Sequence, residues 1–136
     1  MKKKSKFFVL PIVFVIFVLD QFAKSYAGKF FSVTCNKGIA FGVKFADPFD
    51  IVLPAIFTLI IFYFVVRESR VVNIISMSMI VGGGVSNLAD RVIGGCVRDF
   101  IPFGSFSTFN VADFAITLGV VLFLINIGGR GTRKSL

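Results

Sequence analysis

Four long apolar runs dominate the chain, at about 7–27, 49–66, 71–89 and 110–127. A membrane-spanning helix needs roughly 20 mostly apolar residues to cross about 30 Å of hydrocarbon, and the second run reaches that length only if Phe49 and its neighbours extend it. A short Arg-Glu-Ser-Arg turn at 67–70 makes the second and third runs antiparallel neighbours. The pattern predicts an all-α membrane protein, with four transmembrane helices forming a single integral-membrane domain over residues 1–136.

The composition agrees with a membrane protein. Of the 136 residues, 56% are hydrophobic and 19 are Phe, and the mean hydropathy is +0.90, which is too apolar for a soluble domain of this size. The first run follows a lysine-rich start and therefore also resembles a signal peptide. Lys24 and Tyr26 crowd the position where such a peptide would be cleaved. We therefore expect an uncleaved first helix.

The basic residues predict the orientation of the chain. They form clusters that flank the runs: Lys2, Lys3, Lys4 and Lys6; Arg67 and Arg70; Arg130, Arg133 and Lys134. By the positive-inside rule these clusters are cytoplasmic, so both termini lie inside and the connections at about 28–48 and 90–109 lie outside. Nine of the 15 basic residues belong to these flanks, so topology and anionic lipid explain much of the net charge of +8. We expect no nucleic-acid partner.

The two outer connections carry different signals. Residues 29–36 combine β-branched and aromatic side chains before the turn formers Asn36 and Gly38, which predicts a small β-structure on the outer surface. Residues 100–109 place apolar side chains around Pro102 and Gly104, as in a loop lying in the lipid interface.

Each outer connection also holds one of the two cysteines. An oxidising compartment would permit a bridge between Cys35 and Cys96, although their spacing does not demand one. Lipid attachment at Cys35 is disfavoured, because the preceding Ser-Val-Thr lacks the usual small residue. With two cysteines and no histidine, we expect no transition-metal site and no cofactor.

Two carboxylates beside apolar runs are the candidate chemistry. A carboxylate next to hydrocarbon costs roughly 2.5 to 3.5 kcal/mol on insertion scales, so Asp99 and Asp113 indicate function. Asn110 is a good helix N-cap, which would make Asp113 an acid favoured by the helix dipole alone. Asp99, however, has no obvious cationic partner except the adjacent Arg98. If the two acids lie close together they share a proton, as in an aspartic peptidase.

Other polar and small residues have structural interpretations. Asp20 and Lys24 stand four residues apart and can form an ion pair. Asp90 and Arg91 are adjacent on a helix, so each is expected to pair elsewhere. The glycines at 82–84 predict close helix contact.

Two alternatives to an aspartic enzyme remain. A Ser-Lys enzyme would use Ser25 beside Lys24, or Ser32 near Lys29. A small transporter or assembly factor would use its intramembrane acids to carry protons.

Five blocks resemble, in order and topology, the signature of the lipoprotein signal peptidase family, also called signal peptidase II. The blocks are Asp20–Lys24, Asn36–Phe41, Gly82–Arg91, Val97–Phe100 and Phe109–Asp113. The resemblance implies a four-helix aspartyl endopeptidase with a small extracytoplasmic β-cradle, in the bacterial cytoplasmic membrane with its active site on the outer face. It implies removal of the signal peptide from diacylglyceryl-modified prolipoproteins, by a cut before the lipidated cysteine. Membrane lipid and globomycin-type inhibitors are the further partners it implies.

The resemblance also assigns residues. The family's catalytic dyad falls in the last two blocks, here Asp99 and Asp113. Substrate-binding or supporting roles fall on Asp20, Lys24, Asn36, Gly38, Ala40, Asn87, Asp90, Arg91, Asn110 and Ala112. Ser86 departs from the family by replacing a glycine, and the outer loop between the catalytic blocks is short. We expect the first change to leave the chemistry intact and the second to alter how substrate is covered.

Overall fold

The computed structural model describes residues 5–38, 43–105 and 107–131 of the chain. A short 3-10 turn, η1 (Ser5–Phe8), leads into α1 (Val9–Phe30), and α2 (Phe49–Arg67), α3 (Val71–Gly94) and α4 (Val111–Gly131) follow. Each of the four has a segment long and apolar enough to cross a membrane. The predicted four-helix membrane fold is confirmed, although α1 and α3 both continue past the apolar runs.

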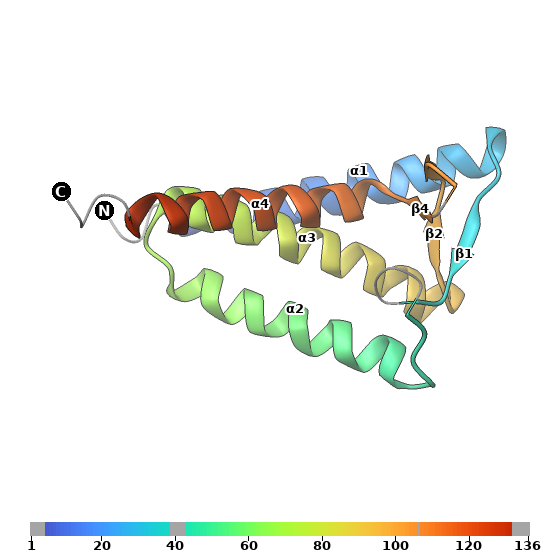
Figure 1. The fold of residues 1–136 in the computed structure, drawn as a ribbon, viewed down its shortest axis with the longest axis horizontal. Coiled ribbons are helices and arrows are strands. Elements are labelled where there is room, and N and C mark those ends of the chain that lie inside the picture. The colour runs from blue at the N-terminus through green and yellow to red at the C-terminus, as the bar shows by residue number, and fades with distance from the viewer. Residues whose placement is uncertain (1–4, 39–42, 106, 132–136) are drawn as a thin grey trace.

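Helix α3 is the centre of the bundle. In its most apolar window 61% of the residues are buried, against 11 to 17% in the other three helices. It packs against α1, α2 and α4 (Figure 1). A buried cluster at one end joins α1, α2 and α3 through Val9, Val65, Ile74, Met77 and Val81. The other helices expose most of their apolar side chains, as expected where lipid is the solvent.

Three consecutive glycines let the neighbouring helices approach α3 at one level. A Cβ added to Gly82 would lie 3.2 Å from the Cα of Val13 on α1, and one added to Gly84 would lie 2.6 Å from Thr58 Oγ1 on α2. A Cβ on Gly83 would lie only 2.5 Å from the carbonyl oxygen of Ala112 on α4. Successive helical residues point about 100° apart, so each glycine faces a different helix. The predicted close packing at 82–84 is confirmed.

Short strands cover one end of the bundle, called the strand end below (Figure 1). Strand β1 (Thr34–Asn36) pairs antiparallel with β2 (Val97–Asp99), with Thr34 opposite Asp99. Strands β3 (Ile101–Phe103) and β4 (Ser107–Phe109) form a hairpin. The predicted small β-structure is confirmed, but only the last three residues of 29–36 are strand because α1 runs on to Phe30. The connection 100–109 was expected to be a loop and instead contains the hairpin.

A disulfide between Cys35 and Cys96 joins β1 to the segment that follows α3. The bridge closes where the two connections pair, with Cys35 opposite Arg98 in the strand register. Because Cys35 is in the bridge, its sulfur is not available for lipid attachment. Just before Cys96, Gly95 takes a left-handed conformation (φ 72°) and caps α3 by donating its N–H to the Arg91 carbonyl.

Candidate active site

Asp99 ends strand β2 and its side chain faces into the strand end of the bundle. The residue is 1% exposed. Two asparagine amides donate to its carboxylate, Asn36 Nδ2 to Oδ2 at 2.9 Å and Asn110 Nδ2 to Oδ1 at 2.7 Å. The adjacent Arg98 turns away to pair with Asp90, so no cation takes the place of these amides in direct contact with Asp99 among the residues described.

Asp113 stands in the first turn of α4 and is half-buried. It and Asn110 cap each other: the Asp113 N–H donates to Asn110 Oδ1 at 2.8 Å, and the Asn110 N–H donates to Asp113 Oδ2 at 3.2 Å. This is the reciprocal capping arrangement, and it confirms the predicted N-cap. Asn87 Nδ2 also donates to Asp113 Oδ1, at 2.8 Å. Capping alone therefore does not account for all the contacts of Asp113.

Asn110 brings the two acids together. Its side chain is completely buried, and its Nδ2 reaches both Asp99 Oδ1 and, at 3.1 Å, Asn87 Oδ1. Asn87 in turn contacts Asp113. Asn110, just before α4, and Asn87, in the C-terminal half of α3, thus supply amides to both acids, which lie in one polar cluster at the strand end.

Burial sets the acidity of Asp99. Loss of water around the carboxylate raises its pKa to about 6, and the nearby negative charge of Asp113 also raises it. The amide of Asn36 opposes the shift, because it donates to the ionised form. A carboxyl group with this pKa can hold a proton close to neutral pH.

Lys24 joins α1 to α3. Its ammonium lies 2.5 Å from Asp20 Oδ2 and 3.0 Å from Asp90 Oδ2, and it donates to Asn87 Oδ1 at 3.0 Å. The predicted Asp20–Lys24 ion pair is confirmed, as is the expectation that Asp90 pairs away from Arg91. Ser25 beside it is exposed. The Lys24 side chain contacts Asp20, Asp90 and Asn87, whereas Ser25 is exposed, so the two do not form the hydroxyl–lysine pair that a Ser-Lys enzyme needs.

Asp20 also contacts the start of α4. Its Oδ1 accepts from the backbone N–H of Ala112 at 2.8 Å, and its Oδ2 accepts from Ser86 Oγ at 2.7 Å. The N–H groups of the first helical turn have no partner within the helix, so Asp20 supplies one from another element. Ala112 is fully buried against Gly83. Ser86 is therefore part of the polar cluster.

Sequence reasoning did not assign Gln21 and Arg98, which the structure places in the same cluster. Arg98 Nη2 donates to Gln21 Oε1 at 2.6 Å and to Asp90 Oδ1 at 2.8 Å. Gln21 Nε2 donates to Asp90 Oδ1 and to Ser86 Oγ, each at 3.0 Å. One signal was present: Gln21 stands between Asp20 and Lys24, directly after a long apolar stretch.

Arg91 and Asn36 hold the connection that follows β1. Arg91 Nη2 donates to the Gly38 carbonyl at 2.8 Å, and Asn36 Oδ1 accepts from the Gly38 N–H at 2.8 Å. A hollow of about 450 Å³ beside them is lined in part by Arg91, Lys37 and Lys44. Ala40, the remaining predicted position, lies outside the described residues.

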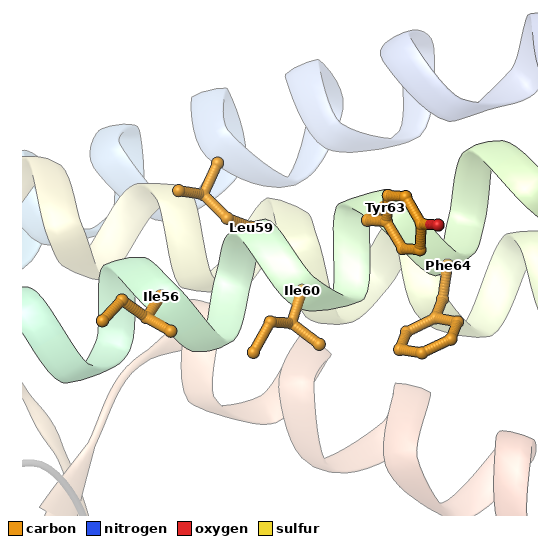
Figure 2. A pocket seen from close by; sticks show the side chains of 5 residues that line it. All are labelled: Ile56, Leu59, Ile60, Tyr63 and Phe64. Atoms are coloured by element: carbon orange, nitrogen blue, oxygen red, sulfur yellow. The ribbon is translucent and has the colours of Figure 1, made fainter.

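The cluster contains acids, amides and cations but no arrangement typical of a metal centre. Within 5–38, 43–105 and 107–131, the structure gathers no group of three or more His, Cys, Asp or Glu side chains that could bind an ion. A second hollow of about 440 Å³ lies on α2, and neither Asp99 nor Asp113 lines it (Figure 2). Its lining is Ile56, Leu59, Ile60, Tyr63 and Phe64. That surface suits hydrocarbon and not acid–base chemistry.

The fold and the cluster define a class: a multi-pass membrane protein with a pair of acids joined by asparagines at one end of its helices. A family model described as signal peptidase (SPase) II, of the peptidase A8 group, matches residues 12–128. The chain therefore belongs to the signal peptidase II family, whose members are aspartic peptidases.

Individual relatives agree with this family. The lipoprotein signal peptidase of Caldicellulosiruptor bescii is 38% identical over 126 residues, covering 82% of this chain and 84% of that protein. The lipoprotein signal peptidase of Aquifex aeolicus is 32% identical over 145 residues, covering 90% and 87%. A bacterial membrane enzyme solved by the in meso method at 2.3 Å resolution has the same fold, with a TM-score of 0.84 at 23% identity, over 93% of this chain and 90% of that one.

Proposed function

We propose that Asp99 and Asp113 are the catalytic dyad of an endopeptidase that removes the signal peptide from diacylglyceryl-modified prolipoproteins, cutting before the lipidated cysteine. Removal of signal peptides from prolipoproteins is the activity of the family. The observation that supports this dyad is the double contact of Asn110, which donates its amide to Asp99 and caps Asp113. No other pair of acids in the described part of the chain shares an asparagine beside a strand and a helix start in this way.

The chemistry follows from two acids that share one proton. The ionised member takes a proton from water, and the water oxygen attacks the carbonyl carbon of the scissile peptide bond. The protonated member donates to the carbonyl oxygen, so a tetrahedral diol forms without a covalent enzyme intermediate. The raised pKa of Asp99, about 6, supports retention of one proton by the pair near neutral pH.

The asparagines and Arg91 support this chemistry by position. Asn36, Asn87 and Asn110 donate to the acids through side-chain amides, and among the described residues neither acid has a direct ion pair to break before reaction. We assign to Arg91 and Gly38, together with Ala40, the shaping of the connection that covers the substrate. The adjacent hollow is lined by basic side chains and also by Asp47 and Asp50, and this charged lining suits a polar peptide segment outside the membrane.

We propose that the strand end faces outward from the bacterial cytoplasmic membrane and that both termini are cytoplasmic. The start of α1, the end of α2 and the start of α3 lie opposite the strands (Figure 1), and by sequence these helix ends carry Lys6, Arg67 and Arg70. The positive-inside rule places that end in the cytoplasm. Reporter fusions in the turn at Ser69 and after Leu136 should read cytoplasmic, whereas a fusion after Phe45 should read external.

Lipid and globomycin-type inhibitors are the remaining partners in this proposal. The exposed apolar side chains of α2 (Figure 2) would contact acyl chains of the membrane or of the substrate. A globomycin-type inhibitor would compete with the substrate at the dyad.

The test is cleavage of a diacylglyceryl-prolipoprotein by the purified full-length protein. Asp99→Asn and Asp113→Asn should each lower turnover by about a hundredfold or more, because each removes an acid–base group. Glu68→Gln changes an acid to an amide at the opposite end of the bundle and should leave turnover per folded molecule unchanged. Thermal unfolding of each variant measures the folded fraction. Near-wild-type cleavage by either dyad variant would remove that residue from the dyad and make Asp90 the next candidate.

A further inference from the structure

Arg98 directly precedes Asp99 on β2, yet its contacts lie in another part of the cluster. Its guanidinium reaches Gln21 on α1 and Asp90 on α3, at 2.6 and 2.8 Å. Its backbone N–H donates to the second oxygen of Asp90 at 2.9 Å. Asp90 therefore binds both the main chain and the side chain of Arg98. This double contact fixes the strand immediately before Asp99.

The contacts continue from Asp90 across the bundle. Asp90 pairs with Lys24 at 3.0 Å, Lys24 pairs with Asp20 at 2.5 Å, and Asp20 accepts from the Ala112 N–H at 2.8 Å. Ala112 is the residue before Asp113, just as Arg98 is the residue before Asp99. A chain of alternating charges thus ends, on each side, at the backbone N–H that precedes one of the two acids.

The members of this chain of contacts differ in exposure. The side chains of Asp20, Lys24 and Asp90 are at most 1% exposed, so removing one leaves a buried charge without its partner. The side chain of Arg98 is 38% exposed. Its loss leaves Asp90 with Lys24 and Gln21. Substituting Arg98 therefore removes the guanidinium contacts to Asp90 and Gln21 while the backbone N–H contact and the buried ion pairs are kept.

We propose that Arg98 is a positioning residue for the proposed peptidase reaction, acting with Gln21 and Asp90 to set the place of Asp99 relative to Asp113. This inference rests on the proposed function of the two acids. Arg98 contacts neither acid through its side chain in the structure; it acts on the strand that carries Asp99. A small misplacement of a catalytic group lowers turnover strongly without a matching loss of substrate binding.

The experiment compares Arg98→Met, Arg98→Lys, Gln21→Met and the Arg98→Met/Gln21→Met double variant, using the full chain in detergent and a diacylglyceryl-prolipoprotein. Arg98→Met should lower kcat per folded molecule by about tenfold to a hundredfold, with KM within about twofold of wild type. Arg98→Lys keeps a charge that can reach Asp90 and should recover part of the loss. Arg70→Met, an exposed arginine at the opposite end of α3, is the matched control and should behave as wild type.

The double variant tests whether Gln21 and Arg98 act together. If they do, its kcat should fall by clearly less than the product of the two single losses. Multiplicative losses would overturn the joint role, and an unchanged kcat per folded Arg98→Met molecule would overturn the positioning role, even if its unfolding temperature fell. Failure of the wild-type protein to cleave would overturn the proposed function and this inference with it. Wild-type cleavage with unaffected Arg98→Met overturns the inference alone.

Discussion

Asn110 and Asp113 cap each other at the start of α4, and the same asparagine donates its side-chain amide to Asp99. A helix cap normally stabilises one helix end and nothing more. Here the cap also joins the end of β2 to the first turn of α4. The position of one acid is therefore tied to the local folding of the element that carries the other.

Replacing Asn110 should affect stability and turnover together. Asn110→Ala removes the cap, which costs about 1 kcal/mol of unfolding free energy, and also removes the amide between the two acids. We expect turnover per folded molecule to fall well beyond what the stability loss explains. Asn126→Ala is the matched control, since Asn126 on the same helix bonds to Asn73 at the opposite end. Equal turnover in the two variants, measured by precursor cleavage, would contradict the role given to Asn110.

The pH dependence of turnover should show the dyad losing its proton. Because the pKa of Asp99 in the free protein is about 6, kcat/KM should fall as pH rises through about 6. Asn36→Leu removes a donor that favours the ionised carboxylate, so the falling limb should move to higher pH. If the fall in the pH–rate profile stays at the same pH in Asn36→Leu, or moves to lower pH, the ionisation of Asp99 does not cause that fall.

The same pKa predicts how stability changes with pH. The ordinary value for Asp is 3.8, and Asp99 in the folded protein is raised to about 6. Between these values the folded protein binds a proton that the unfolded chain has released, so the contribution of Asp99 to stability falls as pH rises across that window. The test measures the unfolding temperatures of wild type and Asp99→Asn from pH 4 to 7. As pH rises, the unfolding temperature of wild type should fall relative to that of the variant. The opposite trend would refute the raised pKa.

Removing Lys24 should harm folding more than chemistry. Lys24→Met leaves Asp20 and Asp90 buried without their shared cation, which costs about 3–5 kcal/mol of unfolding free energy. Turnover of the folded fraction should fall less than in Asp99→Asn. Unfolding and cleavage are measured on the same preparation. A Lys24 variant that folds normally yet is as inactive as Asp99→Asn would favour a lysine base instead.

Gly83 should tolerate no side chain. A Cβ there would meet the Ala112 carbonyl at 2.5 Å, so Gly83→Ala must push α4 away from α3 and displace the turn that carries Asp113. We expect lower unfolding temperature and lower turnover. Gly128→Ala, on α4 with no atom within 4 Å of the added Cβ, should be neutral or stabilising by about 0.5–1 kcal/mol. Equal unfolding temperatures and turnover in the two variants would mean that α4 does not pack tightly against Gly83.

The helices and their number were predictable because apolar length is a strong signal in a membrane protein. The Asp20–Lys24 pair and the Asn110 cap were predictable because both are local, within four residues along one helix. For Asp90 and Arg91 the sequence predicted only that they would not pair with each other, because adjacent helical residues do not face each other. Their partners, Lys24 and Gly38, come from distant segments and leave no local pattern.

The hairpin at 101–109 and the roles of Arg98 and Gln21 were not predictable for a related reason. Three-residue strands are too short to show alternation, and Phe and Ile suit a lipid-facing loop as well as a strand. Arg98 stood beside Asp99 in the sequence and suggested a pair with it. Adjacent strand residues point to opposite faces, however, so Arg98 reached Asp90 instead.

Helix α3 carries both the glycines at 82–84, which fix its neighbours, and the polar side chains from Ser86 to Arg91, which bind Lys24, Asp113 and Gly38. The positions of the packing contacts and of the polar contacts are thus both set by the same helical turns of α3. Inserting a single residue between Gly84 and Ser86 would rotate the polar side chains by about 100° and shift them by about 1.5 Å relative to the glycine contacts. A change of length within this segment of α3 would therefore separate the contacts that pack the helices from the contacts that hold the polar cluster.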